Sequence, residues 1–151
     1  KKMAPSLVAI HSPAGMPGVV IICIDKRFPG EAISASLPIA SRFNIAKAII
    51  VVDKDVNILN LHDVMAAVGS RWQPDPASLI IKQMQGMVVD PSTHQDGVTS
   101  KIIIDATRQL PAEGGPDSFP PVSRTLLTEG APGVFELVDK RWPEYWKSFE
   151  G

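Results

Sequence analysis

Four short apolar runs, separated by stretches with helical spacing, constrain the fold of this chain more than any other feature. Two of the runs consist almost entirely of Val and Ile, which is typical of strands buried on both faces of a sheet. A further run near the start predicts an additional strand. The alternation of strands and helices predicts an α/β domain with a mixed or mostly parallel sheet flanked by helices. The predicted strands are VVIICID (19–25), AIIVVD (48–53), SLIIKQM (78–84), KIIIDA (101–106) and SLVAIH (6–11).

Three segments carry the apolar spacing of amphipathic helices, namely residues 30–43, 61–72 and 132–149. Pro38 and Pro143 predict a kink or a break in the first and the third, because proline lacks the backbone donor of a helix interior. In the second helix the predicted apolar stripe is Leu61, Val64, Met65, Val68 and Trp72, with Arg71 outside it. The chain is predicted to form one structural domain in three parts. These are an α/β domain over 1–110, an extended Pro/Gly-rich connection over 111–131, and a terminal amphipathic helix over 132–151 to which that connection leads.

Composition excludes several classes of partner and location. A formal net charge of −1 provides no field that would attract nucleic acid or an anionic membrane surface. The apolar runs are far shorter than the ~20 residues of a membrane-spanning helix. We therefore expect neither a nucleic-acid partner nor a membrane partner. The single cysteine, Cys23, rules out an internal disulfide and favours a reducing compartment, the cytoplasm.

The stretch IIVVDKDVNILN (49–60) ends an apolar run in three oxygen-bearing side chains. Asp53, Asp55 and Asn57 match the first ligand positions of an EF-hand calcium loop. Ile58 and Val64 stand where that loop requires Gly and Glu, so calcium binding is not expected. Asp55 or Asn57 is interpreted as satisfying backbone donors at the turn before the next helix. A catalytic carboxylate pair stays the alternative, since ligands often bind at the carboxyl ends of parallel strands.

The sequence contains no recognisable motif for nucleophilic catalysis, metal binding or phosphate binding. Cys23 lies inside an apolar strand, where an inert buried thiol is expected. The histidines at 11, 62 and 94 are scattered and belong to no HExxH, CxxC or GxSxG pattern. Glycine-rich phosphate loops are also absent from the sequence. From these residues we predict no catalytic residue, no metal ligand and no self-contained active site.

Several segments, taken in order, resemble the carboxyl-terminal region of the UbiD family of decarboxylases. Their order and spacing cover most of the chain, which makes the resemblance specific although no single segment is. The matching segments are LVAIHSPAG (7–15), IDKRFPGEA (24–32), AKAIIVVDKDVNI (46–58), DVMAAVGSRWQPD (63–75), VVDPS (88–92) and SKIIIDAT (100–107).

The resemblance implies a carboxy-lyase that acts on aromatic, phenolic or α,β-unsaturated carboxylic acids with prenylated flavin mononucleotide (prenylated FMN). In that family the flavin stabilises the negative charge released as CO2 leaves. A divalent metal, Mn2+ or Mg2+, bridges its phosphate, and K+ is a further candidate ion. The family's proton-transfer and metal-binding residues lie in an upstream domain, and nothing in this chain matches them. The implied partners are the aromatic acid, CO2, the upstream flavin-binding domain and further copies of the chain in a homo-oligomer.

Few functional residues of the family carry over to this chain. A basic family position that contacts the flavin phosphate falls at Ser41, so its neighbour Arg42 is the candidate cofactor-binding residue. A pocket residue that closes over the substrate falls at Met87, with Val89 beside it, and both are candidate substrate-pocket residues. A tryptophan common in the family is replaced by Ala66.

The resemblance favours a carboxyl-terminal decarboxylase domain that is inactive alone. A naturally separate, non-catalytic assembly subunit is the alternative, and a stand-alone nucleotide-binding domain is a third hypothesis. The helix predicted at 132–149 is expected to form oligomer contacts. Changing Trp142 and Tyr145 to Ala should then alter the molecular mass seen by light scattering.

Overall fold

The computed structural model describes residues 6–94, 97–117 and 133–147, and the chain forms two compact units, residues 1–119 and 120–151. The first unit holds the sheet and most of the helices, and the second holds the terminal helix. The elements in order are β1 (Leu7–His11), β2 (Val19–Ile24), α1 (Glu31–Arg42), β3 (Ala48–Asp53), α2 (Leu61–Arg71), β4 (Ser78–Gln85), β5 (Val98–Asp105), the 3-10 turn η1 (Pro111–Glu113) and α4 (Val134–Lys147).

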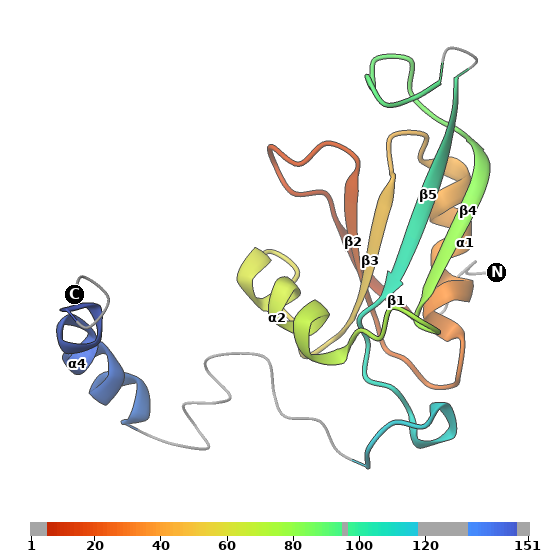
Figure 1. Cartoon of the computed structure of the whole chain (residues 1–151). Coiled ribbons are helices and arrows are strands. Elements are labelled where there is room, and N and C mark those ends of the chain that lie inside the picture. Colours follow the sequence, from red (N-terminus) through yellow and green to blue (C-terminus); the bar gives the residue numbers. More distant parts are fainter. Residues whose placement is uncertain (1–5, 95–96, 118–132, 148–151) are drawn as a thin grey trace. The chain divides into compact units, whose positions relative to one another are not determined.

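The sheet is mixed, as the alternation of strands and helices predicts. Its five strands lie in the order β1-β2-β3-β5-β4 (Figure 1). Strands β2, β3 and β5 are parallel, and the edge strands β1 and β4 pair antiparallel to their neighbours. The parallel strands therefore end at one edge of the sheet and begin at the opposite edge. These two edges, named here the carboxyl edge and the amino edge, carry different chemistry.

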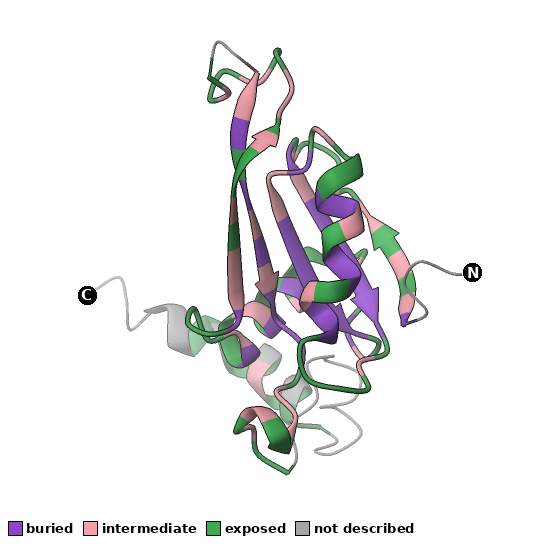
Figure 2. Ribbon diagram, turned by 90° about the vertical axis from the view of Figure 1, so that its right-hand side faces the viewer, coloured by how far each residue is buried: buried purple, intermediate pink, exposed green. Residues whose placement is uncertain are grey.

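The hydrophobic core lies between α1 and one face of the sheet. Figure 2 shows the buried residues gathered along the central strands. Small side chains on α1 allow the helix to lie close to the strands, and each buried Val or Ile contributes roughly 1.5–3 kcal/mol relative to an exposed position. The fully buried members include Ile22 and Ile24 of β2, Ile49 and Val51 of β3, Ile103 of β5, and Ala32 and Ala40 of α1.

Two features of the helices differ from the sequence-based expectation. Neither helix breaks at its proline, because α1 continues through Pro38 and α4 continues through Pro143. At Pro38 the lost donor would have paired with the carbonyl of Ser34, which is an exposed residue where water can replace the missing bond. In α2 the stripe is also displaced, because Leu61 and Met65 are exposed whereas Arg71 is buried. The helix therefore turns Val64, Ala67 and Arg71 inward.

The terminal helix α4 covers most of the predicted segment 132–149. Its residues Val134 and Leu137 are exposed within the second unit. The side chains of Trp142 and Tyr145, expected to form oligomer contacts, lie outside the described part of the structure. Among the described residues, no helix has the length and apolar character that would let it cross a membrane.

Candidate functional site

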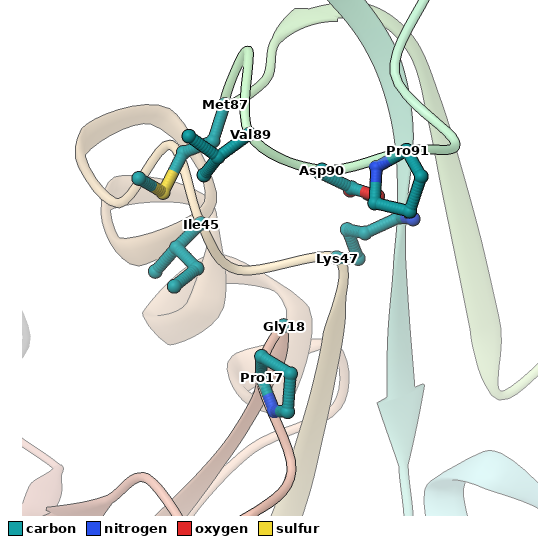
Figure 3. A pocket seen from close by; sticks show the side chains of 8 residues that line it. All are labelled: Pro17, Gly18, Ile45, Lys47, Met87, Val89, Asp90 and Pro91. Carbon is teal, nitrogen blue, oxygen red and sulfur yellow. Dashed lines mark ion pairs between the residues drawn. The ribbon is translucent and has the colours of Figure 1, made fainter.

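A mainly apolar cavity of about 180 Å3 opens at the amino edge of the sheet (Figure 3). One side is formed by residues that directly precede β2 and β3. The other side is formed by the loop that follows β4, which brings its side chains over the strand ends. The lining residues are Pro17, Gly18, Ile45 and Lys47 on the first side, and Met87, Val89, Asp90 and Pro91 on the second.

The loop after β4 is shaped by Asp90. Its backbone N–H donates to the Met87 carbonyl at 3.0 Å, and its carbonyl accepts from the Thr93 N–H at 3.0 Å. Its carboxylate accepts from the N–H of Ser92 at 3.0 Å and from the hydroxyl of Ser92 at 2.8 Å. This is the turn that an Asp forms with the backbone two residues later. At Gly86 an added Cβ would lie 2.9 Å from the Thr93 hydroxyl oxygen, so the loop packs closely there.

Lys47 crosses from one side of the cavity to the other. Its Nζ lies 2.9 Å from a carboxylate oxygen of Asp90 and also donates to the Ser92 hydroxyl. The hydrogen bond from Lys47, with those from Ser92, lowers the pKa of Asp90 far below its usual range. Asp90 is therefore ionised at neutral pH, and the charge of Lys47 is balanced inside the cavity.

The structure brings two of the three sequence-predicted site residues together. Met87 and Val89 both line the cavity, although Val89 is 82% exposed in this chain. Arg42 is exposed in the last turn of α1 and is not one of the lining residues. Its contact with the flavin phosphate, and the contact of Met87 and Val89 with substrate, stay predictions.

Sequence reasoning missed Lys47 and Asp90 as parts of this site. The Asp-Pro-Ser sequence at 90–92 is a signal for the turn, because Asp and Pro favour such loops. No local pattern indicates that Lys47 is the partner, because it belongs to the connection between α1 and β3.

The carboxyl edge holds Asp53, the last residue of β3, and Asp55, which follows the strand. Arg71 Nη1 donates a hydrogen bond to the Asp53 carboxylate at 3.1 Å. The same guanidinium donates two hydrogen bonds to the Asp55 carboxylate, from Nη1 at 3.0 Å and from Nη2 at 2.7 Å. Asp53 also accepts from the backbone N–H of Arg108 at 2.6 Å. Both carboxylates are thus engaged in a buried ionic network, and this geometry does not support a free catalytic pair.

The turn role predicted for Asp55 or Asn57 is confirmed at Asn57, and the cap of α2 itself is formed by Asn60. The side chain of Asn60 accepts from the N–H of His62 at 3.1 Å and caps α2. Asn57 accepts from the N–H of Leu59 at 3.1 Å, so it satisfies a turn donor before the helix. Asp55 pairs with Arg71 instead, because the last turn of α2 brings the guanidinium to the end of β3.

Burial acts to raise the pKa of both carboxylates, but their net pKa shifts are opposite. Burial raises the pKa of Asp53, whose hydrogen bonds only partly offset it. Burial also acts to raise the pKa of Asp55, but hydrogen bonds from Arg71 prevail and the pKa is lowered. The stability that Asp55 contributes is therefore present above its ordinary pKa of 3.8 and is lost as the pH falls through its lower folded value.

A second ionic network ties the 108–117 segment to the carboxyl edge. The Nζ of Lys26 lies 2.8 Å from Glu113 and 3.4 Å from Asp105. The Glu113 carboxylate also accepts from the N–H of Leu110 at 2.8 Å and from the N–H of Gly30 at 3.2 Å. Glu113 therefore compensates for the missing side-chain cap of α1.

Changing Glu113 to Gln is expected to lower the free energy of unfolding by about 1–2 kcal/mol, because charge-assisted hydrogen bonds are lost. Urea denaturation at pH 7 measures this loss, and Asp117→Asn, at an exposed aspartate of the same segment, is the matched control. The pKa of Glu113 is lowered, since hydrogen bonds from Lys26 and the backbone outweigh burial. The difference from wild type should thus shrink as the pH falls below 4.5. A difference that persists in acid would contradict this role.

Known proteins with similar sequences and structures agree with the fold. The family model of the 3-octaprenyl-4-hydroxybenzoate carboxy-lyase (UbiD) C-terminal domain matches residues 1–106. The chain belongs to the UbiD family. The resemblance found in the sequence is therefore confirmed. Among the described residues of this UbiD-family chain, no group of three or more His, Cys, Asp or Glu residues is placed to hold a metal ion.

Curated relatives include decarboxylases of two kinds. The chain is 35% identical to a phenolic acid decarboxylase of Sedimentibacter hydroxybenzoicus over 93% of its own length and 28% of the relative. It is 35% identical to an anhydromevalonate phosphate decarboxylase of Archaeoglobus fulgidus over 62% of its length and 22% of the relative. The chain thus spans less than a third of the length of either relative.

Solved structures of UbiD-class enzymes share this fold. The open form of vanillic acid decarboxylase from Sedimentibacter hydroxybenzoicus, with a truncated ShVdcD, superposes with a TM-score of 0.72 at 30% identity, over 97% of this chain and 30% of that one. An evolved dimeric form of the enzyme HmfF from Pelotomaculum thermopropionicum, in complex with prFMN, gives a TM-score of 0.61 at 25% identity, over 88% of this chain and 25% of that one.

Proposed function

We propose that this chain is the carboxyl-terminal domain of a prenylated-FMN-dependent decarboxylase of aromatic, phenolic carboxylic acids, and that its amino-edge cavity forms one wall of the active site. The observation that carries the proposal is the meeting of Met87 and Val89 with Ile45 and Pro17 in one apolar cavity. The match to a phenolic acid decarboxylase over 93% of the chain supports it.

The charge of the cavity favours an aromatic acid over a phosphorylated one. Its lining is mostly apolar, and Lys47, the only cation among the eight lining residues, is paired with Asp90 at 2.9 Å. A phosphate group requires cations or donors that are free to bind it. A flat apolar ring instead gains from contact with Met87, whose flexible thioether adapts to aromatic surfaces.

The residues of this chain fit one wall of a flavin site. The apolar side chains of Met87 and Val89 would exclude water and orient the substrate ring against the cofactor. Arg42 is the candidate contact for the flavin phosphate. Bound prenylated FMN supplies the electron sink that stabilises negative charge as CO2 leaves. We assign the proton-transfer residues, the Mn2+ or Mg2+ and the K+ to the upstream part of the whole protein.

Assembly and location complete the proposal. We infer a homo-oligomer in which α4 contacts another copy, because its Val134 and Leu137 are exposed within the second unit and a related enzyme has been solved as an evolved dimer. A cytoplasmic location is supported by the free, buried thiol of Cys23, which would suit a reducing compartment.

The isolated chain is expected to release no CO2 when it is incubated with prenylated FMN and a panel of aromatic acids, whereas the whole protein is expected to decarboxylate at least one.

In the whole protein, Met87→Ala should lower kcat/KM for that acid roughly tenfold, because an apolar contact to the ring is removed. Met65→Ala is the control, since Met65 is an exposed methionine on α2 outside the cavity lining. CO2 release by the isolated chain would contradict its inactivity, and an unchanged kcat/KM for Met87→Ala would contradict the pocket.

A further inference from the structure

Lys47 joins the two sides of the cavity and has a rigid base. Its backbone N–H donates to the Gly18 carbonyl at 2.8 Å, and its carbonyl accepts from the N–H of Ile102 at 2.7 Å. Its aliphatic stem passes close to Gly18, where an added Cβ would meet the Lys47 Cδ at 3.5 Å. The backbone of Lys47 is thus held between β2 and β5, and only its side chain extends toward the loop (Figure 3).

The other end of the connection is the residue that organises the loop. Lys47 Nζ lies 2.9 Å from Asp90, and the Asp90 N–H in turn donates to the carbonyl of Met87. Val88 and Val89 are 91% and 82% exposed, so their own packing does little to hold the loop. The pair between Lys47 and Asp90 therefore ties this loop, and with it Met87 and Val89, to the opposite side of the cavity.

We propose that Lys47 is a positioning residue that holds the wall formed by Met87 and Val89 over the cavity and so sets how closely an aromatic substrate is enclosed. The proposal rests on the proposed function for the identity of the substrate. The pair is partly exposed, so its loss should lower the population of molecules in which the loop holds Met87 and Val89 over the cavity by about two- to fivefold. The same exposure makes the effect sensitive to ionic strength.

A second role for Lys47, direct binding of the substrate carboxylate, predicts a different response. If Asp90 positions the loop through Lys47, then Asp90→Asn should loosen the wall as Lys47→Met does. If Lys47 binds the acid directly, Asp90→Asn should release the cation from its competitor and tighten substrate binding. Asn retains an oxygen that can accept the hydrogen bonds from Ser92, so this substitution removes the charge and keeps the turn.

Hydrogen exchange of the purified chain tests the positioning directly. Amides of residues 86–93 are expected to exchange about two- to fivefold faster in Lys47→Met and in Asp90→Asn than in wild type. Lys54→Met is the matched control, because Lys54 forms a comparable exposed pair with Asp25 at 2.9 Å outside the cavity. Unchanged exchange in the first two variants, or an equal increase in the control, would overturn the proposal.

Kinetics of the whole protein then separate the two roles. Both variants should raise the KM for the aromatic acid about two- to fivefold and leave kcat unchanged. A lower KM for Asp90→Asn, together with a higher KM for Lys47→Met, would assign Lys47 to direct binding and overturn the proposal. If the wild-type whole protein decarboxylates no aromatic acid, the proposed function fails, while the exchange result still decides whether Lys47 positions the loop.

Discussion

Replacing Arg71 by Met is expected to lower the free energy of unfolding by about 3–5 kcal/mol, the cost typical of removing one partner from a buried ionic network. The Arg71 side chain is fully buried and pairs with both Asp53 and Asp55. Without it, the buried carboxylate of Asp53 retains only Arg108, whose side chain is 44% exposed. Urea denaturation of the chain at pH 7 measures the loss.

Two further variants and a change of pH identify the cause of this loss of stability. Lys54→Met breaks an exposed pair with Asp25 and should cost at most about 1 kcal/mol. Adding Asp53→Asn and Asp55→Asn to Arg71→Met should restore part of the stability, because no uncompensated charge then remains. Lowering the pH toward the ordinary carboxyl pKa should likewise narrow the gap to wild type, since the unpaired carboxylates become protonated. Equal losses for Arg71→Met and Lys54→Met would contradict the importance of the buried network.

Changing Lys101 to Ala is expected to destabilise the chain by about 3 kcal/mol, for two additive reasons. Lys101 is 2% exposed, so its long stem fills space in the core beneath α1. Its Nζ donates to the carbonyls of Ala40 and Phe43, both at 2.7 Å, where α1 ends and its last carbonyls lack helical partners. Thermal or urea denaturation gives the size of the combined loss.

Lys101→Met separates the stem from the charge. Methionine keeps most of the volume but cannot donate, so a loss of about 1–2 kcal/mol is expected. The Ala40 carbonyl loses the hydrogen bond from Lys101, and the Phe43 carbonyl keeps only the one from the Ala46 N–H. Burial lowers the pKa of Lys101, which means that desolvation of the cation offsets part of what those hydrogen bonds contribute. Lys82→Ala, at an exposed position of β4, is the control and should change little. A Lys101→Met variant as stable as wild type would show that the helix-end bonds have no net effect.

Local patterns were sufficient to predict the elements and the class of fold. The Val/Ile run at 48–53 coincides with β3, and the run at 19–25 differs from β2 by one residue. These strands are recognisable because burial on both faces requires continuous apolar side chains. The UbiD resemblance was also readable from ordered segments, and it directed attention to Met87 and Val89. Those residues then proved to share a cavity, although neither lies in a predicted strand or helix.

The long-range partners of the charged residues were not predictable in the same way. Arg71 was placed outside the apolar stripe of its helix, and the structure buries it against the end of β3. Lys101 begins an apolar run in the sequence, and in the structure its ammonium donates a hydrogen bond to the Ala40 carbonyl in the last turn of α1. The Lys101 pairing depends on which strands are neighbours, because β5 lies next to β3 although β4 comes between them in the chain. The Arg71 pairing depends on how α2 packs against the end of β3.

The α/β class, the main strands and the family were readable from the chain alone, because these follow from apolar periodicity and ordered local segments. The pairing of Asp53 and Asp55 with a buried arginine, and of Lys47 with Asp90 across the cavity, became visible only in three dimensions. The physical reason is that a buried or paired charge is set by what lies beside it in space. For these residues the partner comes from another element, so no local pattern records it.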